Sequence, residues 1–560
     1  MGRWRWLWIM VVGLLVGCGG DAEVTPAGGE EAVEVTAEVT AEVVATATAE
    51  MATFEPKVGE HYWWNDRVFY EIFVRSFYDS DGDGVGDLVG LIEKLDYLND
   101  GDPTTDDDLG VTGIWLMPIM ESPSYHGYDV VDYYRIDEEY GTQADFLRFM
   151  EEARARDIKV VVDLVINHTG SGHPWFQQAQ DEASPYRDYY VWAEEPIEGQ
   201  EAYWHQRGGG DYYYAYFWGE MPDLNYRNEA VTEGMYEVTR YWLEEMGVDG
   251  FRMDAIKHLI EVGRSIENTD ETHEWLEAYH QFYKGINPEA LTVGEVWSTT
   301  DDVAPYVEDE MDIAFDFELA EGMLESSFSR RAVHIERAQA KVQAAYPLNQ
   351  FATFLANHDQ ERTRSRLFND EQAKLAAALQ MTFGGVPFIY YGEEIGMQGK
   401  KPDENLRRPM QWSPEAGVGF TTGTPWREPF EDYDERHVAG QTADSESLLS
   451  YYRGLIRLRG EHEALRRGDW VPVMSDNRGV YAFLRYTSSE RLLIVVNFNK
   501  EAVETYQLEM ALGPLTAVEG ASLVWGEGEA VAPIVTETGG FVGYRPLALP
   551  AETAVVINLE

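Results

Sequence analysis

Short apolar, β-branched runs alternate with helical patterns over most of this chain. The strand-like runs cover residues 68–77, 111–120, 159–167, 248–255, 291–297, 312–317, 352–359 and 386–394. Between them, apolar residues recur at helical spacing, as at Phe146, Phe149, Met150 and Ala153. Near-continuous apolar strands separated by helices indicate a parallel sheet covered on both faces. Eight such units predict an α/β fold, a closed (β/α)8 TIM barrel, with an open doubly wound sheet as the alternative.

Two regions interrupt or follow this alternation. Residues 170–222 separate the third strand from its helix, and a connection this long predicts an inserted subdomain. After a helical stretch near 446–467, residues 480–487 and 491–499 alternate in the manner of strands. We therefore predict a barrel from residues 61–169 and 223–467, an inserted subdomain at 170–222 and a C-terminal all-β domain, a β-sandwich, at 468–560.

The N-terminal residues have the layout of a secretory signal. Arg3 and Arg5 precede an apolar run at residues 6–16, which is shorter than the roughly 20 residues of a membrane span. Residues 15–18, Leu-Val-Gly-Cys, resemble the lipobox of bacterial lipoproteins, where cleavage leaves the cysteine as a lipid-modified N-terminus. We predict a signal peptide at 1–17 and an extracytoplasmic protein anchored through Cys18 to a bacterial cell-envelope membrane. Plain secretion is the alternative.

Composition narrows the classes of partner. Residues 18–60 are rich in Gly, Ala, Val, Thr and Glu and predict a disordered acidic tether. The whole chain carries 100 acidic and 43 basic residues, so its surface repels phosphate backbones and nucleic acid is not an expected partner. Its one cysteine excludes an intrachain disulfide framework. No feature indicates an obligate protein partner.

Polar side chains gather where the predicted strands end. In a parallel barrel these ends meet on one face, where active sites are built. Burying a polar group at the end of an apolar strand costs free energy, so such groups are expected to be paired with a partner or to have a function. The residues concerned are Asn167, His168, Arg252, Asp254, Glu295, His358 and Asp359.

Several short segments resemble a known family. Segments GFRMDAIKH (250–258), GEVW (294–297), FLANHD (354–359) and DLVINHT (163–169) resemble the four signature regions of glycoside hydrolase family 13, the α-amylase family. GVTGIWLMPI (110–119), YHGYD (125–129) and MPDLN (221–225) resemble its further regions. The motifs occur in the family's order, and the resemblance covers residues 61–560.

The resemblance implies a catalytic triad. Asp254 would be the nucleophile, Glu295 the general acid and then the general base, and Asp359 would stabilise the transition state. The implied outcome is retention of the α configuration through a covalent glycosyl-enzyme. We expect Arg252 to keep Asp254 ionised.

The same resemblance implies the substrate contacts. Tyr128 would stack on the sugar, and His168 and His358 would hydrogen-bond it. Arg252, Lys257 and His258 complete the implied substrate-binding set. The aromatic run at 211–219 either lines the cleft or packs inside the inserted subdomain.

The motifs also bear on specificity. Ala255, Lys257 and His258 resemble the residues of enzymes that hydrolyse α-1,4-glucans, and MPDLN is intermediate between QPDLN of oligo-1,6-glucosidases and MPKLN of neopullulanase-like enzymes. We predict an α-amylase whose substrate is an α-glucan polysaccharide or oligosaccharide. The alternatives are an oligo-1,6-glucosidase or α-glucosidase, a transglycosylating relative and a non-catalytic sugar-binding lipoprotein. The intact triad disfavours the last.

One acidic loop predicts a metal site. Asp79, Asp81, Asp83 and Asp87 alternate with small residues, so a tight turn can direct several carboxylates at one hard cation. An EF-hand is excluded because Gly90 stands where that loop needs a glutamate. The resemblance implies Ca²⁺ with the Val85 carbonyl as a further ligand, and a solvated acidic turn is the alternative. It implies a second calcium site at Asn167, Asp223 and the His258 carbonyl.

Overall fold

Eight parallel strands form a closed barrel in the computed structural model, which describes residues 54–560. The sheet order is β11-β10-β9-β5-β2-β1-β13-β12, and a parallel bridge between Phe315 and Ala352 joins its two ends. Each of the eight predicted runs contains one barrel strand, so the TIM barrel is confirmed. The strands are β1 (Phe69–Ile72), β2 (Gly113–Leu116), β5 (Lys159–Leu164), β9 (Gly250–Met253), β10 (Leu291–Gly294), β11 (Ile313–Ala314), β12 (Ala352–Thr353) and β13 (Val386–Tyr390).

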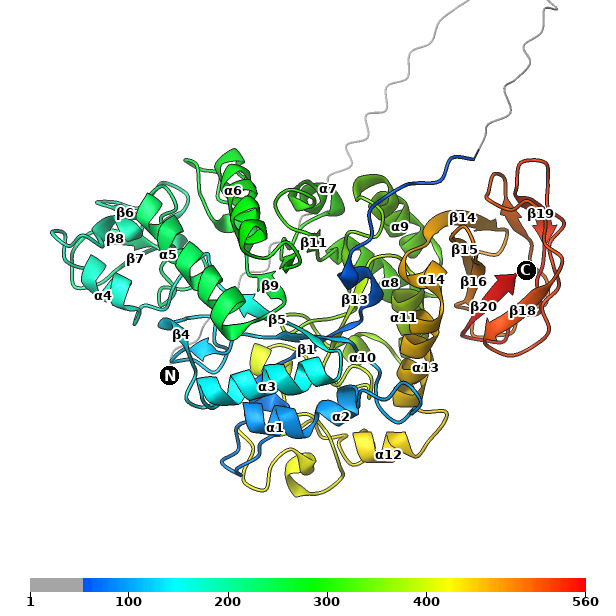
Figure 1. The fold of residues 1–560 in the computed structure, drawn as a ribbon, viewed down its shortest axis with the longest axis horizontal. Coiled ribbons are helices and arrows are strands. Elements are labelled where there is room, and N and C mark those ends of the chain that lie inside the picture. Colours follow the sequence, from blue (N-terminus) through cyan, green and yellow to red (C-terminus); the bar gives the residue numbers. More distant parts are fainter. Residues whose placement is uncertain (1–53) are drawn as a thin grey trace, which may run out of the picture. The chain divides into compact units, whose positions relative to one another are not determined.

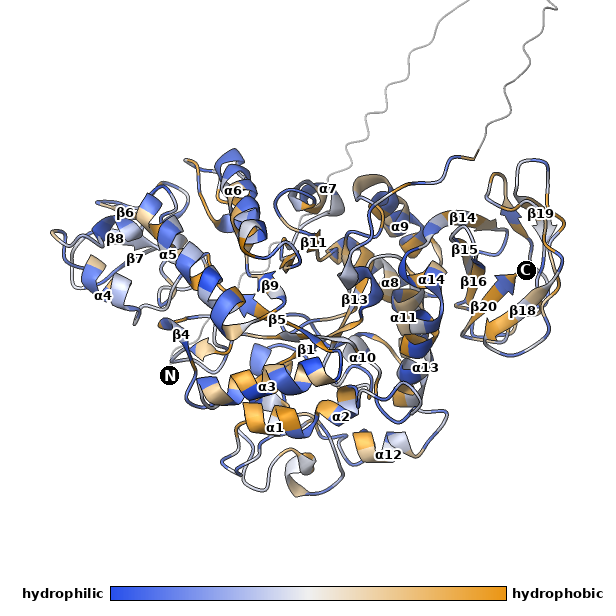
Figure 2. Ribbon diagram, viewed as in Figure 1, coloured by the Kyte–Doolittle hydropathy of each residue, from blue (hydrophilic) through white to orange (hydrophobic). Residues whose placement is uncertain are grey.

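Helices cover the outside of the barrel (Figure 1). Those between the strands are α1 (Leu88–Glu93), α2 (Leu95–Leu98), α3 (Gln143–Ala155), α5 (Glu229–Arg240), α6 (Asp270–Ile286), α7 (Thr300–Val303), α8 (Phe317–Ser329), α9 (Val333–Ala345), α10 (Thr363–Arg366) and α11 (Asp370–Thr382). Helix α3 begins at a reciprocal capping box between Thr142 and Asp145 and buries the apolar face predicted for it. Figure 2 shows both hydrophobic and hydrophilic residues along this helix. Helix α5 continues as a π-helical turn at Tyr241–Met246.

The barrel interior changes from apolar to charged along the strands. Phe69 and Val161 belong to the cluster that fills the barrel. Two residues further on, Glu71 and Asp163 are also buried. Because side chains two apart on a strand point to the same side, these carboxylates lie above the apolar residues toward the carboxyl ends of the strands.

The inserted region folds as a small sheet beside the barrel. It holds α4 (Pro174–Ala179), β6 (Trp192–Ala193), β7 (Trp204–Gln206) and β8 (Tyr212–Tyr214), with strand order β6-β8-β7. A bridge between His168 and Asp223 closes its base, so the two ends of the insertion return to the same point of the barrel. A separate hairpin, β3 (Met120–Glu121) with β4 (Asp132–Ile136), follows β2.

The C-terminal region is an antiparallel all-β domain, as predicted. It follows α12 (Val438–Thr442), α13 (Leu448–Glu461) and α14 (Glu463–Arg466). Its strands are β14 (Asp469–Ser475), β15 (Val480–Tyr486), β16 (Arg491–Asn497), β17 (Leu508–Met510), β18 (Ala521–Trp525), β19 (Phe541–Tyr544) and β20 (Thr553–Leu559). Strand β14 pairs with β15 on one side and with β17 on the other. The strands on both sides of β14 contribute side chains to one apolar core.

Two buried arginines meet at the end of α11, and one of them, Arg485, holds this domain to the barrel. Arg459 of α13 donates hydrogen bonds to the carbonyls of Met381, Phe383 and Gly385. Arg485 of β15 donates to the Thr382 carbonyl at 3.3 Å. These bonds satisfy carbonyls in the last turn of α11 and just beyond it, where a helix end leaves backbone acceptors without partners.

The predicted tether ends earlier than residue 60. Lys57 donates its backbone N–H to Asp469 at 2.8 Å and its ammonium to the Gln343 carbonyl at 3.0 Å. Phe54 packs on Tyr486. The prediction of a disordered tether was wrong for residues 54–60, because the contacts of Phe54 and Lys57 hold this segment against the folded body. The predicted signal peptide, Cys18 and the rest of the tether to residue 53 lie outside the described residues.

No helix within residues 54–560 has both the length and the apolar character needed to cross a membrane.

Glu393, just after β13, predicts a pH dependence of stability. Its carboxylate accepts hydrogen bonds from Thr363 and Tyr452, and burial raises its pKa to about 8. Since the unfolded pKa is about 4.5, the folded state binds the proton more tightly, and stability falls as pH rises from about 4.5 to 8. We expect Glu393→Gln to melt at increasingly higher temperature than the wild type across this range.

Calorimetry at pH 5 and pH 9 tests this expectation. The control is Glu519→Gln, a change at an exposed glutamate of the C-terminal domain. An equal difference in melting temperature between Glu393→Gln and wild type at both pH values would contradict the assignment.

Candidate active site

A pocket of about 470 Å³ opens at the carboxyl ends of the barrel strands. Its volume lies in the range of small-molecule sites. The residues that line it include the predicted Tyr128, His168, Asp254, Lys257, His258, Glu295 and Asp359. The structure therefore brings together acids that are more than 100 residues apart in the chain. Arg252 and His358 lie beneath the pocket, with 1% and 0% of their surface exposed.

Arg252 joins the acids of the site. Its Nη1 atom donates to Asp254 at 2.7 Å and to Asp163 at 2.9 Å, and Nη2 lies 2.8 Å from Glu295. Asp163 is fully buried and also accepts a hydrogen bond from Tyr128 at 3.1 Å. One guanidinium thus fixes the relative positions of Asp254 and Glu295.

Sharing Arg252 changes the expected protonation. We expected this arginine to keep Asp254 ionised, but its single charge serves three buried carboxylates. Burial therefore raises the pKa of Asp254, although Arg252 opposes the shift. Burial likewise raises the pKa of Asp163, again against the opposing charge of Arg252.

Asp254 and Glu295 are also joined through the backbone. The N–H of Ala255 donates to Glu295 Oε2 at 3.1 Å. Ala255 has φ 51°, a left-handed conformation that is uncommon for a residue with a side chain. This turn follows β9 directly and directs the Ala255 N–H toward Glu295.

A second charged group supports Asp359. His358 Nδ1 lies 2.6 Å from Glu71, and its Nε2 lies 2.7 Å from the Tyr128 hydroxyl and 3.1 Å from Asp359. Although burial opposes it, the carboxylates of Asp359 and Glu71 raise the pKa of His358 to about 9. The ring is therefore cationic at neutral pH. With both nitrogens engaged, it holds Tyr128 and Asp359 in place from below.

Arg407 contacts the same acid from the other side. It donates to Asp359 at 2.7 Å and to the His358 carbonyl at 3.1 Å. Although burial opposes the shift, His358 and Arg407 lower the pKa of the Asp359 carboxyl, so it is anionic. Asp359 keeps 30% of its side chain exposed and lines the pocket, where its oxygens can accept further hydrogen bonds.

The remaining predicted residues form the walls. His168 donates a hydrogen bond from Nε2 to the Tyr128 carbonyl at 3.2 Å, and burial lowers its pKa to about 3, so the ring is neutral. His258 stacks on Tyr216 at 4.0 Å. Lys257 pairs with Glu267 at 2.6 Å and donates to the Trp297 carbonyl.

The aromatic run at 211–219 serves both of its predicted roles. Tyr213 and Tyr214 are buried inside the inserted subdomain. Tyr216 and Phe217 line the pocket. The change occurs where β8 ends, because the chain there turns from the small sheet toward the barrel.

Sequence reasoning missed several functional residues. Glu71 and Asp163 each lie inside an apolar run. Each is a lone acid on the same side of its strand as an apolar residue of the barrel interior. Such a lone acid in a buried strand could have identified both residues as part of the site. Arg407 lies in a long connection without periodicity. Tyr125, His126, Trp297 and Asp403 also line the pocket.

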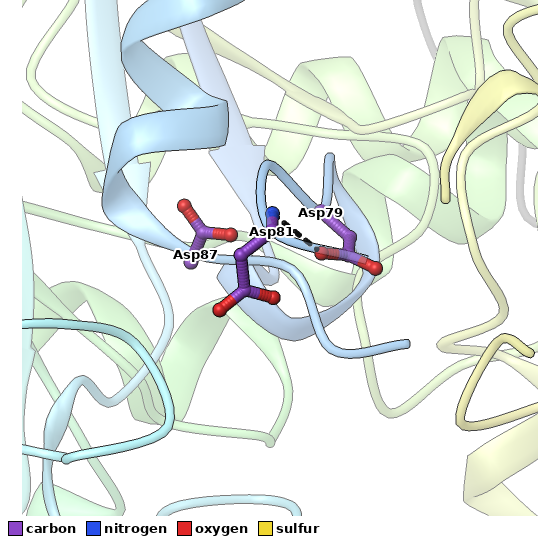
Figure 3. Close-up of side chains that lie close together, drawn as sticks. All are labelled: Asp79, Asp81 and Asp87. Atoms are coloured by element: carbon purple, nitrogen blue, oxygen red, sulfur yellow. Dashed lines mark hydrogen bonds between the residues drawn. The ribbon is translucent and has the colours of Figure 1, made fainter. Parts of the chain in front are cut away.

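The acidic loop lies apart from these residues, after β1. Asp79, Asp81 and Asp87 each place a carboxylate oxygen within 4.8 Å of the others (Figure 3). Asp83 and Val85 are neighbours in the loop, where Asp83 accepts from the Val85 N–H at 2.8 Å. Asp79 accepts from the N–H groups of Gly82 and Gly84 at 2.7 and 2.8 Å, which curls the loop. The structure thus gathers three of the four predicted aspartates.

The second predicted metal site contains unsatisfied oxygens. Asn167 Nδ2 donates to Asp223 at 3.1 Å, while Asn167 Oδ1 is buried without a hydrogen-bond partner among the described residues. Glu261 also has one such oxygen. Burial, together with the Glu261 carboxylate, raises the pKa of Asp223. Acceptor oxygens without donors suit a cation.

Comparison with known proteins accords with this site. The chain is 38% identical over 446 residues to "Alpha-amylase 3" of Dictyoglomus thermophilum, covering 78% of this chain and 86% of that protein. It is 33% identical over 524 residues to an oligo-1,6-glucosidase of Parageobacillus thermoglucosidasius, covering 79% and 91%. The crystal structure of an α-amylase from H. orenii superposes with a TM-score of 0.78 at 39% identity, covering 90% of this chain and 100% of that one.

The match to a protein family is equally extensive. Residues 71–468 match the family described as "Alpha amylase, catalytic domain". This segment contains seven of the eight barrel strands in full, the inserted subdomain and every acid of the pocket. The chain therefore belongs to the α-amylase family of glycoside hydrolases.

Proposed function

We propose that this enzyme hydrolyses α-1,4-glucosidic bonds in starch and maltodextrins with retention of configuration. The observation that carries the proposal is the bridging of Asp254 and Glu295 by Arg252 at the floor of the pocket, opposite Asp359. Glycosidic cleavage needs a proton donor at the leaving oxygen and a carboxylate at the anomeric carbon, and this pair supplies both.

The proposed reaction has two steps. Glu295 donates its proton to the glycosidic oxygen while Asp254 attacks the anomeric carbon, which releases the leaving chain and forms a glycosyl-enzyme. Glu295 then removes a proton from water, which attacks the same carbon and frees Asp254. Retaining enzymes hold the two carboxyl groups about 5 Å apart. The contacts of both acids with adjacent nitrogens of one guanidinium support such a short separation.

The other polar groups support binding of the sugar. Asp359, held anionic by His358 and Arg407, would accept hydrogen bonds from hydroxyls of the glucosyl unit and grip them more tightly as positive charge develops in the ring. The Tyr128 ring, fixed through its hydroxyl, offers a flat face to the sugar.

An α-amylase is the specificity that we favour. The alternatives, an oligo-1,6-glucosidase, an α-glucosidase or a transglycosylating enzyme, remain because one similar relative bears the name oligo-1,6-glucosidase. Ala255, Lys257 and His258 at the pocket wall support the α-1,4 assignment, as does the relative named α-amylase.

Product analysis tests this proposal. Soluble starch should yield a mixture of maltooligosaccharides, while isomaltose and sucrose remain intact. NMR should show that the products are first released as α anomers. Glu295→Gln should lose about 10²- to 10⁴-fold in rate, because the general acid is removed. Glu289→Gln, at an exposed glutamate, is the matched control. Cleavage of isomaltose without cleavage of starch would refute the α-amylase proposal, and near wild-type rates in Glu295→Gln would refute the assigned acid.

We also propose that the loop of Asp79, Asp81 and Asp87 holds Ca²⁺, with Asp83 and the Val85 carbonyl as further donors. Three converging carboxylates suit a hard cation of this size. Asn167, Asp223 and the His258 carbonyl would hold a second ion, and the unpartnered oxygens of Asn167 and Glu261 support it. Bound at these positions, Ca²⁺ would neutralise clustered carboxylates and cross-link the loops that carry them.

Removal of calcium should lower the melting temperature. An ion that binds only the folded state stabilises it by about 2.7 kcal/mol at 100 times its dissociation constant. We expect chelation to destabilise the wild type and added Ca²⁺ to restore it, and Asp81→Asn to reduce the response. Asp434→Asn, at an exposed aspartate elsewhere, should respond as the wild type does. A melting curve that is insensitive to chelation would contradict both sites.

For localisation, we propose an extracytoplasmic protein attached to a membrane by a lipid on Cys18, with secretion as the alternative. The support is the lipobox-like Leu-Val-Gly-Cys at residues 15–18. In a bacterial host, wild-type protein should partition with membranes and Cys18→Ser should not. An unchanged membrane fraction in Cys18→Ser would contradict lipid attachment.

A further inference from the structure

Two further cavities continue the catalytic pocket. The first, about 600 Å³, shares Trp297 and Asp359 with the catalytic pocket. The second, about 390 Å³, shares Glu361 and Arg366 with the first. Because neighbouring cavities share wall residues, the three adjoin in a row, which we call the cleft. Its distal end lies between α8 and the segment that follows α10.

Three exposed aromatic rings lie along this cleft, one near the catalytic pocket and two at the distal end. Trp297, 49% exposed, stacks on Phe317 with ring centroids 5.2 Å apart. At the distal end, Phe328 and Phe368 are 39% and 67% exposed and stack with centroids 4.9 Å apart. Exposed large apolar side chains are normally scattered singly over a soluble protein. Three exposed rings along one cleft, Trp297, Phe328 and Phe368, indicate a surface that binds a ligand.

The distal pair is held in position by a buried polar side chain. Gln372 of α11, which has no exposed surface, accepts from the Phe368 N–H at 2.9 Å and donates to the Phe328 carbonyl at 3.3 Å. This one amide fixes both backbones and so keeps the two rings together. The phenylalanines are thus a built feature and not a loose loop.

Polar groups surround the rings. Arg366 pairs with Glu321 at 2.8 Å, and Glu361 and Lys400 line the same cavity. Flat apolar faces with a few hydrogen-bonding groups at their edges suit a pyranose, which has apolar faces and a rim of hydroxyls.

The position of the cleft indicates which part of a substrate would occupy it. Trp297 follows Glu295 by two residues, and Glu295 is the acid that would protonate the leaving oxygen. The cleft therefore begins on the side of the leaving chain.

We propose that the Phe328–Phe368 pair binds glucosyl units of the leaving part of the same α-glucan chain, several units from the bond that is cut. The inference rests on the proposed function for its ligand. Binding at the distal pair would make the enzyme selective for long chains. A short oligosaccharide occupies only the catalytic pocket and the adjoining cavity and does not extend to the distal pair.

Chain-length dependence of kinetics tests the inference. Phe368→Ala removes an exposed ring and should raise KM for amylose about threefold to tenfold, the loss expected for one aromatic contact, with kcat unchanged. Its kcat/KM on maltotriose should change less than twofold. Phe328→Ala should act in the same direction, and the double variant should add little. The control is Tyr134→Ala, at an exposed tyrosine on β4, which should leave the kinetic constants for both substrates unchanged.

Three results would overturn the inference. They are an unchanged KM for amylose in Phe368→Ala, an equal change on maltotriose and amylose, or a change in oligomeric mass without a change in KM, which would identify the pair as a contact between copies.

Binding separates this inference from the proposed function. In the Glu295→Gln background, calorimetry should show maltoheptaose binding that Phe368→Ala weakens. If this binding is found but the wild-type enzyme does not cut starch, the cleft is supported and the proposed function is refuted. If the wild-type enzyme cuts starch but the binding of maltoheptaose does not depend on Phe368, the proposed function is supported and the distal binding site is refuted.

Discussion

The shared guanidinium of Arg252 is the interaction on which the site depends. Three carboxylates, Asp163, Asp254 and Glu295, surround one cation with 1% of its surface exposed. Removing one partner of a buried ion pair typically costs about 3–5 kcal/mol, because the remaining charge is left without compensation. The charged layer is tolerable only because the barrel closes around it and aligns three different strands. Closure of the sheet and arrangement of the acids are therefore one structural requirement.

The charges at the top of the barrel divide into two groups. Around Arg252, acids outnumber cations, and burial raises the pKa values of Asp163 and Asp254. Around Asp359, His358 and Arg407 supply two cations, and the carboxylate is anionic. The same residue type thus has different protonation at neighbouring positions, according to the number of cations in reach. A glycosidase needs this division, since one acid must give a proton while others stabilise positive charge.

The barrel strands were predictable because each one is apolar on both faces, which no surface strand tolerates. Their ends were predicted too long: β12 covers only Ala352–Thr353, because the polar residues after it leave the sheet for the pocket. The β3–β4 hairpin and the π-helical turn after α5 leave no distinct period in the sequence. In the site, motifs found the acids that face the pocket. The supporting residue Arg407 came from a loop whose path depends on tertiary contacts alone.

The docking of residues 54–57 has a topological consequence. Lys57 contacts the C-terminal end of α9 and the start of β14, and α9 leads directly into β12. Residues 54–57 therefore join the globular body near the amino ends of the strands, on the base of the barrel opposite the pocket. This segment thus leaves the face that carries the pocket uncovered, so that a bulky substrate can approach the acids without meeting it.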